Sequence, residues 1–180
     1  PFNRLIINNQ NFIDKIFTIN HFHKNLFLEK YTKKPVLIYN NYVAKQIKCS
    51  NRYCFKYRLL YVGRLSKEKN VHLLLESFKK VLIHVPNLQI LIAGTGKIKI
   101  IGSRNITFLG KLNFSEIIEN LNNCDYLVLP SSTEGLPFSI LEAMSVGIPC
   151  IYSKINGSNE IITNNYNGFL FNLNGFEKYK

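Results

Sequence analysis

Short apolar runs alternate with longer stretches of helical periodicity from residue 58 onward. This alternation is typical of a parallel β-sheet whose strands are joined by helices, so we expect an α/β, Rossmann-like fold with helices flanking the sheet. The runs that we expect to form strands are 58–63, 88–94, 105–110, 125–130, 148–153 and 167–171.

The stretches between these strands carry signals for helices. Apolar residues recur at i, i+3, i+4 and i+7 through residues 70–85, which predicts an amphipathic helix that ends before Pro86. Asn113 and Glu116 resemble a capping box at the start of the next helix. Residues 158–163 are expected to form a short helical turn.

The first part of the chain carries a separate, smaller pattern. Residues 15–20 and 34–40 are expected to form strands and residues 21–31 the helix between them, which makes a small βαβ unit. Residues 44–57 are polar with scattered aromatic side chains, and we expect them to form a linker. The chain begins at Pro1 without an initiator methionine, so we expect a fragment of a longer protein.

Composition narrows the class of protein. The 180 residues are 46% hydrophobic and 19% charged, which is enough apolar material for a globular core. A formal net charge of +12 favours anionic partners, namely phosphorylated small molecules, acidic membrane surfaces or nucleic acid. The basic residues form only short, scattered clusters, however, and a solvated basic surface is the alternative. We find no run of about 18 apolar residues and no signal-peptide layout.

The sequence gives little support for a metal site or a disulfide framework. The four cysteines include no CxxC pair, and two of them lie in apolar runs, which favours reduced, buried thiols in a cytoplasmic protein. His21 and His23 are two positions apart in an expected helix and therefore point in different directions. We expect no metal-binding residues.

Ligands of open parallel sheets bind where loops leave the carboxyl ends of the strands, and three such loops carry unusual chemistry. In the first loop, Gly63 permits a close turn, and Arg64 and Lys69 supply two cations suited to phosphate oxygens. The second loop contains Gly94 in a glycine-rich turn, which would let a nucleotide approach the backbone. A solvated first loop and a simple turn requirement for the glycines are the alternatives.

The third loop follows Pro130 and leads into a helix that we expect to start around residues 136–138. The N–H groups and the partial positive charge of a helix start form an anion site. Glu134 precedes this start, and Glu142 lies about one turn inside the helix. Carboxylates beside a diphosphate are repelled unless they accept hydrogen bonds, for which sugar hydroxyls are the expected donors.

A nucleotide sugar has a hydroxylated ring on either side of its diphosphate, so one glutamate would serve each ring. The alternatives are an exposed helix residue for Glu142 and, for Glu134, an acid favoured by the helix dipole.

Together these segments resemble the donor-binding half of a retaining GT-B glycosyltransferase of the family 4 type, from about Lys15 to Phe171. The stretch "VGRLSKEKN" is similar to that family's G-R-L-x-x-E-K-G loop, and "EGLPFSILE" matches its E-x7-E motif through Glu134 and Glu142. The stretches "NITFLGKL", "NNCDYLVLPS" and "GSNEIITNNYNGFLF" resemble other segments of the same half.

The resemblance implies a division of the chain into three parts. Residues 58–180 would be the donor-binding domain, the C-terminal half of a GT-B fold. Residues 1–43 would be a remnant of the N-terminal acceptor domain, a small partial βαβ, with Asn40 in the family's asparagine position. Residues 44–57 would be the interdomain linker.

The resemblance also implies roles for individual residues. Arg64 and Lys69 would hold the donor diphosphate, Glu134 the transferred sugar and Glu142 the ribose hydroxyls, while the nucleobase would lie near Gly94 and the segment 111–112. The catalytic residues implied are Arg64, Lys69 and Glu134, and the donor-binding residues are Gly63, Gly94, Lys111, Leu112, Gly135, Leu136, Pro137, Phe138 and Glu142.

The activity implied is transfer of a sugar from a nucleoside-diphosphate sugar to an acceptor hydroxyl, with retention at the anomeric carbon. The acceptor would be a saccharide or a lipid-linked molecule, and no metal, other cofactor or nucleic acid would be needed. Such an enzyme is expected in the cytoplasm, with peripheral contact with an anionic membrane and a context in cell-envelope polysaccharide synthesis.

The sequence departs from the family pattern at several places. Asn70 and Asn156 stand where glycine is usual, and only "KIKIIGSR" separates two strands between which relatives place a full helix. Because a parallel crossover usually needs about a dozen residues, we expect either a turn there or an altered strand order. Three alternative functions stay open: a noncatalytic nucleotide-sugar-binding fragment, a basic module on nucleic acid or acidic membrane, and a sugar-nucleotide epimerase.

Overall fold

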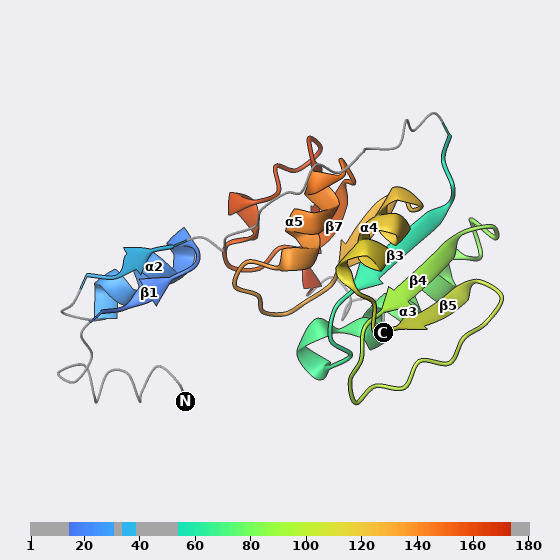
Figure 1. Cartoon of the computed structure of the whole chain (residues 1–180), viewed down its shortest axis with the longest axis horizontal. Helices are drawn as coiled ribbons and strands as arrows, with labels where there is room; N and C mark the ends of the chain where they lie inside the picture. Colours follow the sequence, from blue (N-terminus) through green and yellow to red (C-terminus); the bar gives the residue numbers. More distant parts are fainter. Residues whose placement is uncertain (1–14, 31–33, 39–53, 174–180) are drawn as a thin grey trace.

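The computed structural model describes residues 15–30, 34–38 and 54–173 (Figure 1). In these ranges the larger sheet has six strands in the order β5-β4-β3-β6-β7-β8, and all its pairings are parallel. The strands are β3 (Arg58–Val62), β4 (Gln89–Ala93), β5 (Ile106–Gly110), β6 (Tyr126–Leu129), β7 (Cys150–Ser153) and β8 (Gly168–Phe171). The predicted α/β, Rossmann-like fold is therefore confirmed.

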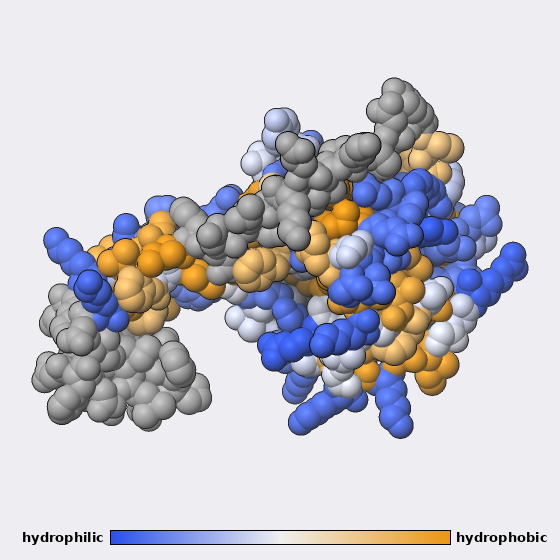
Figure 2. All heavy atoms as spheres, viewed as in Figure 1, coloured by the Kyte–Doolittle hydropathy of each residue, from blue (hydrophilic) through white to orange (hydrophobic). Residues whose placement is uncertain are grey.

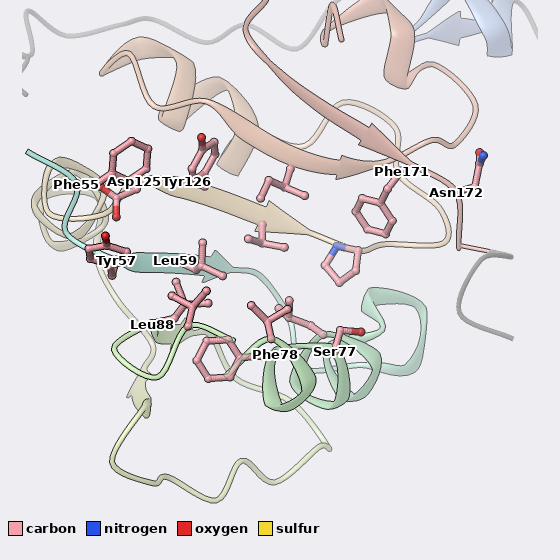
Figure 3. Close-up of a pocket in the computed structure, with 16 residues that line it drawn as sticks. Phe55, Tyr57, Leu59, Ser77, Phe78, Leu88, Asp125, Tyr126, Phe171 and Asn172 are labelled. Atoms are coloured by element: carbon pink, nitrogen blue, oxygen red, sulfur yellow. The ribbon is translucent and has the colours of Figure 1, made fainter. Parts of the chain in front are cut away.

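Helices cover both faces of this sheet. Helices α4 (Phe114–Asn122) and α5 (Phe138–Ser145) contact each other and pack on one face, against β3 and β7. Helix α3 (Val71–Val81) lies on the other face (Figure 3). Because both faces are covered, the central strands are apolar on both sides, and Leu60, Tyr61, Ile90, Ile92 and Leu127 are fully buried.

Local sequence signals set the helix ends, with one correction. The capping box of α4 is confirmed, since Asn113 Oδ1 accepts from the Glu116 amide at 3.0 Å and Glu116 Oε2 accepts from the Asn113 amide at 2.7 Å. Helix α3 ends at Val81, although its apolar pattern continues to residue 85. Pro86 disfavours a helical conformation for the residue before it, so the chain leaves the helix through turns.

The connection from β4 to β5 contains no helix. Residues 94–105 run through turns, and a backbone bridge between Leu65 and Gly96 ties them to the loop after β3. The apolar residues Ile98 and Ile100 still pack against the core. The first of our two expectations for the short "KIKIIGSR" segment is confirmed, because β5 remains paired with β4.

The predicted small βαβ unit is also present, with shorter strands than expected. Strand β1 (Phe17–Thr18) pairs in parallel with β2 (Val36–Leu37), and α2 (His21–Lys30) connects them. Figure 2 shows hydrophobic side chains over this unit, which we call the β1–α2–β2 unit. Its exposed apolar residues include Phe17, Leu28, Val36 and Ile38. Asn40 and most of the predicted linker lie outside the described residues.

Two further expectations concern thiols and membrane spans. Cys124 and Cys150 are buried free thiols and Cys54 is an exposed one, while Cys49 lies outside the described residues. Burial raises the pKa of the Cys150 thiol to about 12, so this thiol stays protonated. Within the described ranges, no helix combines the length and the apolar character that a membrane crossing needs.

A cavity of about 680 Å³ opens between α3 and the sheet (Figure 3). It is lined almost entirely by apolar and aromatic groups, among them Phe55, Tyr57, Phe78, Tyr126 and Phe171. A diphosphate needs cations, and none of the residues that line this cavity is a lysine, arginine or histidine. The candidate site for an anionic ligand therefore lies elsewhere, at the carboxyl edge of the strands.

Candidate functional site

Three loops meet at the carboxyl edge of the sheet, as the sequence predicts. The first loop (63–70) follows β3, and the second loop (94–97) follows β4, which lies in register with it, Val62 opposite Ala93. The third loop (130–137) follows β6, the other neighbour of β3. This edge is where open parallel sheets bind their ligands.

Hydrogen bonds join the first loop to both of the others. The Gly63 amide donates to the Ala93 carbonyl at 3.0 Å, and the Leu65 amide donates to the Thr95 carbonyl at 2.8 Å. On the other side, the Ser132 amide donates to the Glu68 carbonyl at 2.8 Å. The three loops therefore form one connected surface.

The first two loops pack closely only because the second loop has glycine at positions 94 and 96. A Cβ on Gly94, whose φ is +141°, would lie 1.8 Å from the Gly63 carbonyl oxygen. A Cβ on Gly96 would lie 2.2 Å from the Leu65 carbonyl oxygen. Backbone contact thus accounts for both glycines without a ligand, which supports the alternative of a turn requirement.

Lys69 and Glu134 form a direct ion pair between the first and third loops. Lys69 Nζ donates to Glu134 Oε1, and the two side chains are only 13% and 11% exposed. Lys69 ends the short 3-10 helix η2 (Lys67–Lys69). The sequence placed both residues at the site but did not predict their contact, since 65 positions separate them.

Asn70 explains how the chain turns out of η2 without the usual glycine. Its φ of 51° and ψ of 34° are left-handed, a conformation that asparagine tolerates better than most residues. Its side-chain amide donates to the Pro130 carbonyl at 3.0 Å, which fastens the first loop to the third. This departure from the family pattern therefore adds a contact that glycine lacks.

Arg64 occupies a different environment from Lys69. Its side chain is 77% exposed and reaches Glu68 Oε1 at 3.4 Å. A hydrogen bond from Ser66 is the main cause that lowers the pKa of Glu68. Tyr61 Oη donates to the Arg64 carbonyl at 2.7 Å and fixes the backbone from which the guanidinium extends.

A small cavity of about 200 Å³ lies between the first and second loops and α4. Five of the residues predicted to bind the donor line it together: Gly63, Arg64, Gly94, Lys111 and Leu112. Thr95 and Ile117 also line it, and neither was predicted from the sequence. The sequence indicated Ile117 only through its position, one helical turn after the start of α4.

The remaining predicted residues lie at the start of α5. The N-cap is Pro137, which makes no side-chain cap, and Phe138 is the first helical residue. The Gly135 carbonyl accepts a hydrogen bond from Asn20 Nδ2 at 3.0 Å. Gly135 and Leu136 are half-buried, whereas the Phe138 side chain is 50% exposed. The start of α5 thus lacks a side-chain acceptor from its own N-cap.

Glu142 is half-buried in the second turn of α5, and burial raises the pKa of its carboxyl group.

Tyr61 and Tyr152 are buried beside the charge of Glu134. Burial is the main cause that raises the pKa of both phenols, and the charge of Glu134 is the next. Neither tyrosine was predicted as a site residue. The only sequence feature that could have predicted them is that each belongs to a strand that leads into the site.

The arrangement combines cations, N–H donors and carboxylates at one edge of the sheet. These are the groups that hold phosphate oxygens and sugar hydroxyls.

Comparisons with known proteins identify the family and the fold. The sequence profile of the family described as glycosyl transferases group 1 matches residues 43–177. A UDP-Gal:alpha-D-GlcNAc-diphosphoundecaprenol alpha-1,3-galactosyltransferase of Escherichia coli is 35% identical over 66% of this chain and 33% of the relative. An uncharacterised glycosyltransferase of Methanocaldococcus jannaschii is 27% identical over 89% of this chain and 46% of the relative. The chain thus spans less than half the length of these relatives.

Solved structures share the fold. A TarM mutant of S. aureus, crystallised with fondaparinux, alpha-GlcNAc-glycerol and UDP, aligns with a TM-score of 0.80 at 21% identity, covering 98% of this chain and 37% of that one. HepE of Anabaena, in complex with UDP and glucose, aligns with a TM-score of 0.77 at 18% identity, covering 97% of this chain and 56% of that one.

Proposed function

Because the chain belongs to the glycosyl transferases group 1 family, we propose that it contributes the donor site of a nucleotide-sugar-dependent glycosyltransferase. The reaction moves a sugar from a nucleoside-diphosphate sugar to an acceptor hydroxyl, with retention at the anomeric carbon, as in GT-B enzymes of the family 4 type. The observation that carries the proposal is the largely shielded Lys69–Glu134 pair, which lies on hydrogen-bonded loops that also bear Arg64 and the start of α5.

The cations and the helix start stabilise the leaving group in this scheme. Departure of the nucleoside diphosphate builds negative charge on its phosphate oxygens and positive character on the sugar ring. Donors fixed toward the phosphate therefore stabilise the transition state more than the ground state. Arg64, Lys69 and the first-turn amides of α5 supply these donors, and Gly63 and residues 135–138 allow the backbone to approach.

Glu134 binds the transferred sugar while it stays paired with Lys69. Its Oε1 accepts from Lys69, so its second carboxylate oxygen is available to a sugar hydroxyl. The pair keeps a negative group beside a diphosphate without leaving an unbalanced buried charge. Glu142 accepts from the ribose hydroxyls, and the cavity lined by Gly94, Lys111 and Leu112 takes part of the nucleoside.

The relatives support a proposal for the donor class and the acceptor. The galactosyltransferase of E. coli is named for UDP-Gal and a diphosphoundecaprenol acceptor, and HepE was solved with UDP and glucose. We propose a saccharide or lipid-linked acceptor in cell-envelope polysaccharide synthesis, in the cytoplasm and with peripheral contact with an anionic membrane. Since cations and amides suffice to hold the diphosphate, transfer needs no metal ion, and turnover should persist in a chelator.

A donor-turnover assay on the chain tests the proposal. UDP-, GDP- and ADP-sugars are incubated with the protein, and hydrolysis of the donor, in which water takes the sugar, is followed by the release of nucleoside diphosphate. We expect turnover with one donor, and a loss of roughly a hundredfold, or about 3 kcal/mol in the barrier, in Arg64→Ala. Arg104→Ala, the same change at an exposed position before β5, is the matched control and should retain activity.

Two results would contradict the proposed enzyme. Binding without turnover would favour the noncatalytic alternative, and equal activity of Arg64→Ala and Arg104→Ala would remove the role of Arg64.

A further inference from the structure

The β1–α2–β2 unit contacts the six-stranded body through a few specific hydrogen bonds. Glu160, in the short 3-10 helix η3 (Ser158–Glu160), accepts from two consecutive amides at the start of α2. The His21 amide donates to Oε2 at 2.9 Å, and the Phe22 amide donates to Oε1 at 3.1 Å. A carboxylate at a helix start is favoured both by the helix dipole and by charge-assisted hydrogen bonds.

Asn20 makes the second connection, and it uses both ends of its side-chain amide. Oδ1 accepts from the His23 amide at 2.8 Å and caps the start of α2. Nδ2 donates to the Gly135 carbonyl at 3.0 Å, across 115 positions of sequence. Asn20 is only 2% exposed, so water does not compete readily for either bond.

Two glycines of the body fit closely against this turn. A Cβ on Gly135 would lie 2.1 Å from Ile19 Cδ1. A Cβ on Gly157, whose φ is +86°, would lie 3.1 Å from Asn20 Nδ2. The turn between β1 and α2 therefore fits between the third loop and the start of η3, in a space that a side chain at either glycine would crowd.

The bond to Gly135 acts on the candidate site because of where Gly135 lies. It follows Glu134, the partner of Lys69, and it precedes the start of α5. A glycine has wide backbone freedom, so its peptide plane needs an anchor to be held in one orientation. An acceptor bond to its carbonyl fixes the rigid peptide unit between residues 135 and 136.

We propose that Asn20 and Glu160 form a clamp that holds the third loop in its catalytic orientation, with Asn20 as a positioning residue that acts on Glu134 through Gly135. Glu160 holds the start of α2, and α2 in turn presents Asn20 to Gly135. The β1–α2–β2 unit thus takes part in shaping the donor site, although it contributes no group to the donor itself. This inference rests on the proposed function.

The test uses Asn20→Asp, which separates the two bonds of Asn20. The aspartate keeps an oxygen that caps α2, because Asp and Asn are comparable N-caps, but its ionised carboxylate cannot donate to the Gly135 carbonyl. We expect kcat to fall about ten- to a hundredfold while the KM for the donor changes less than about threefold, because misplacement of the loop affects the reacting geometry. Glu160→Gln should give a smaller fall, and Glu76→Gln, on the exposed face of α3, is the control.

Hydrogen–deuterium exchange of the same variants supplies a readout that does not depend on activity. In Asn20→Asp, exchange should rise in residues 134–138 and stay unchanged in α2, whose cap is kept. Faster exchange in both segments would indicate only a loss of structure and would overturn the clamp, as would unchanged exchange in residues 134–138. If exchange rises in residues 134–138 of Asn20→Asp but the wild-type protein shows no turnover, the proposed function is contradicted and the clamp is not. If Asn20→Asp keeps a normal kcat, the clamp is contradicted and the proposed function is not.

Discussion

At the scale of single residues, the site depends on charges that are paired or partly buried. Lys69 and Glu134 are each bound to the other and shielded from water. Arg64 differs, since its side chain is exposed and its nearest acidic partner, Glu68, shares its carboxylate oxygen with Ser66. A diphosphate could therefore recruit Arg64 at little cost in desolvation, while Lys69 is already fixed in place.

Glu142 gives a prediction about pH. Burial raises the pKa of its carboxyl group above the ordinary value, which means that the ionised form is disfavoured in the folded chain. We expect Glu142→Gln to raise the free energy of unfolding at pH 8 by less than about 1 kcal/mol, the effect being reduced by partial exposure. The gain should vanish at low pH, where the carboxyl group is protonated in both the folded and the unfolded states.

Urea unfolding of wild type and Glu142→Gln between pH 3 and 8 measures this effect. The same substitution should weaken donor binding, because an amide is a poorer acceptor for ribose hydroxyls. A stability difference that stays constant across the pH range would contradict the assigned burial of the charge.

At the scale of elements, the turn after η2 connects local conformation to the site. Asn70 combines a left-handed backbone with a hydrogen bond to Pro130, and these two contributions can be separated. Asn70→Gly keeps the conformation and loses the bond, so we expect a loss of about 1 kcal/mol in unfolding free energy. Asn70→Ala loses the bond and adds left-handed strain, so the loss should be about 2 kcal/mol.

Chemical denaturation of both variants measures these losses. Asn156→Ala, a change at an exposed position before η3, is the control and should be nearly neutral. Equal stability of the two Asn70 variants would show that the left-handed backbone at residue 70 carries no cost, contrary to this prediction.

At the scale of the whole molecule, the sheet could be predicted because its signals are local. Apolar runs bounded by turn residues and helical periodicity between them determine the strands of the six-stranded sheet. The capping box of α4 needs only Asn113 and Glu116, three positions apart, and it was predicted correctly. Helix α3 was predicted too long because Leu82 and Val85 continue the apolar pattern even though Pro86 follows.

The contacts that join distant loops could not be read from the sequence. The Lys69–Glu134 pair spans 65 positions and the Asn20–Gly135 bond spans 115, and neither leaves a periodic pattern in the chain. The sequence could place Arg64, Gly94 and Lys111 at one edge, because each follows a strand, and the structure brings them to one cavity. The division of the chain at residues 43 and 57 stays a prediction.

The central claim is that a diphosphate rests between the first loop and the start of α5. Isothermal titration calorimetry of the chain with UDP, GDP, ADP and the corresponding nucleosides tests it most directly. We predict that one diphosphate binds, that its nucleoside binds at least about tenfold more weakly, and that Lys69→Met loses most of this difference. The claim would be contradicted if none of the three diphosphates gave a heat of binding, or if a nucleoside and its diphosphate bound with equal affinity.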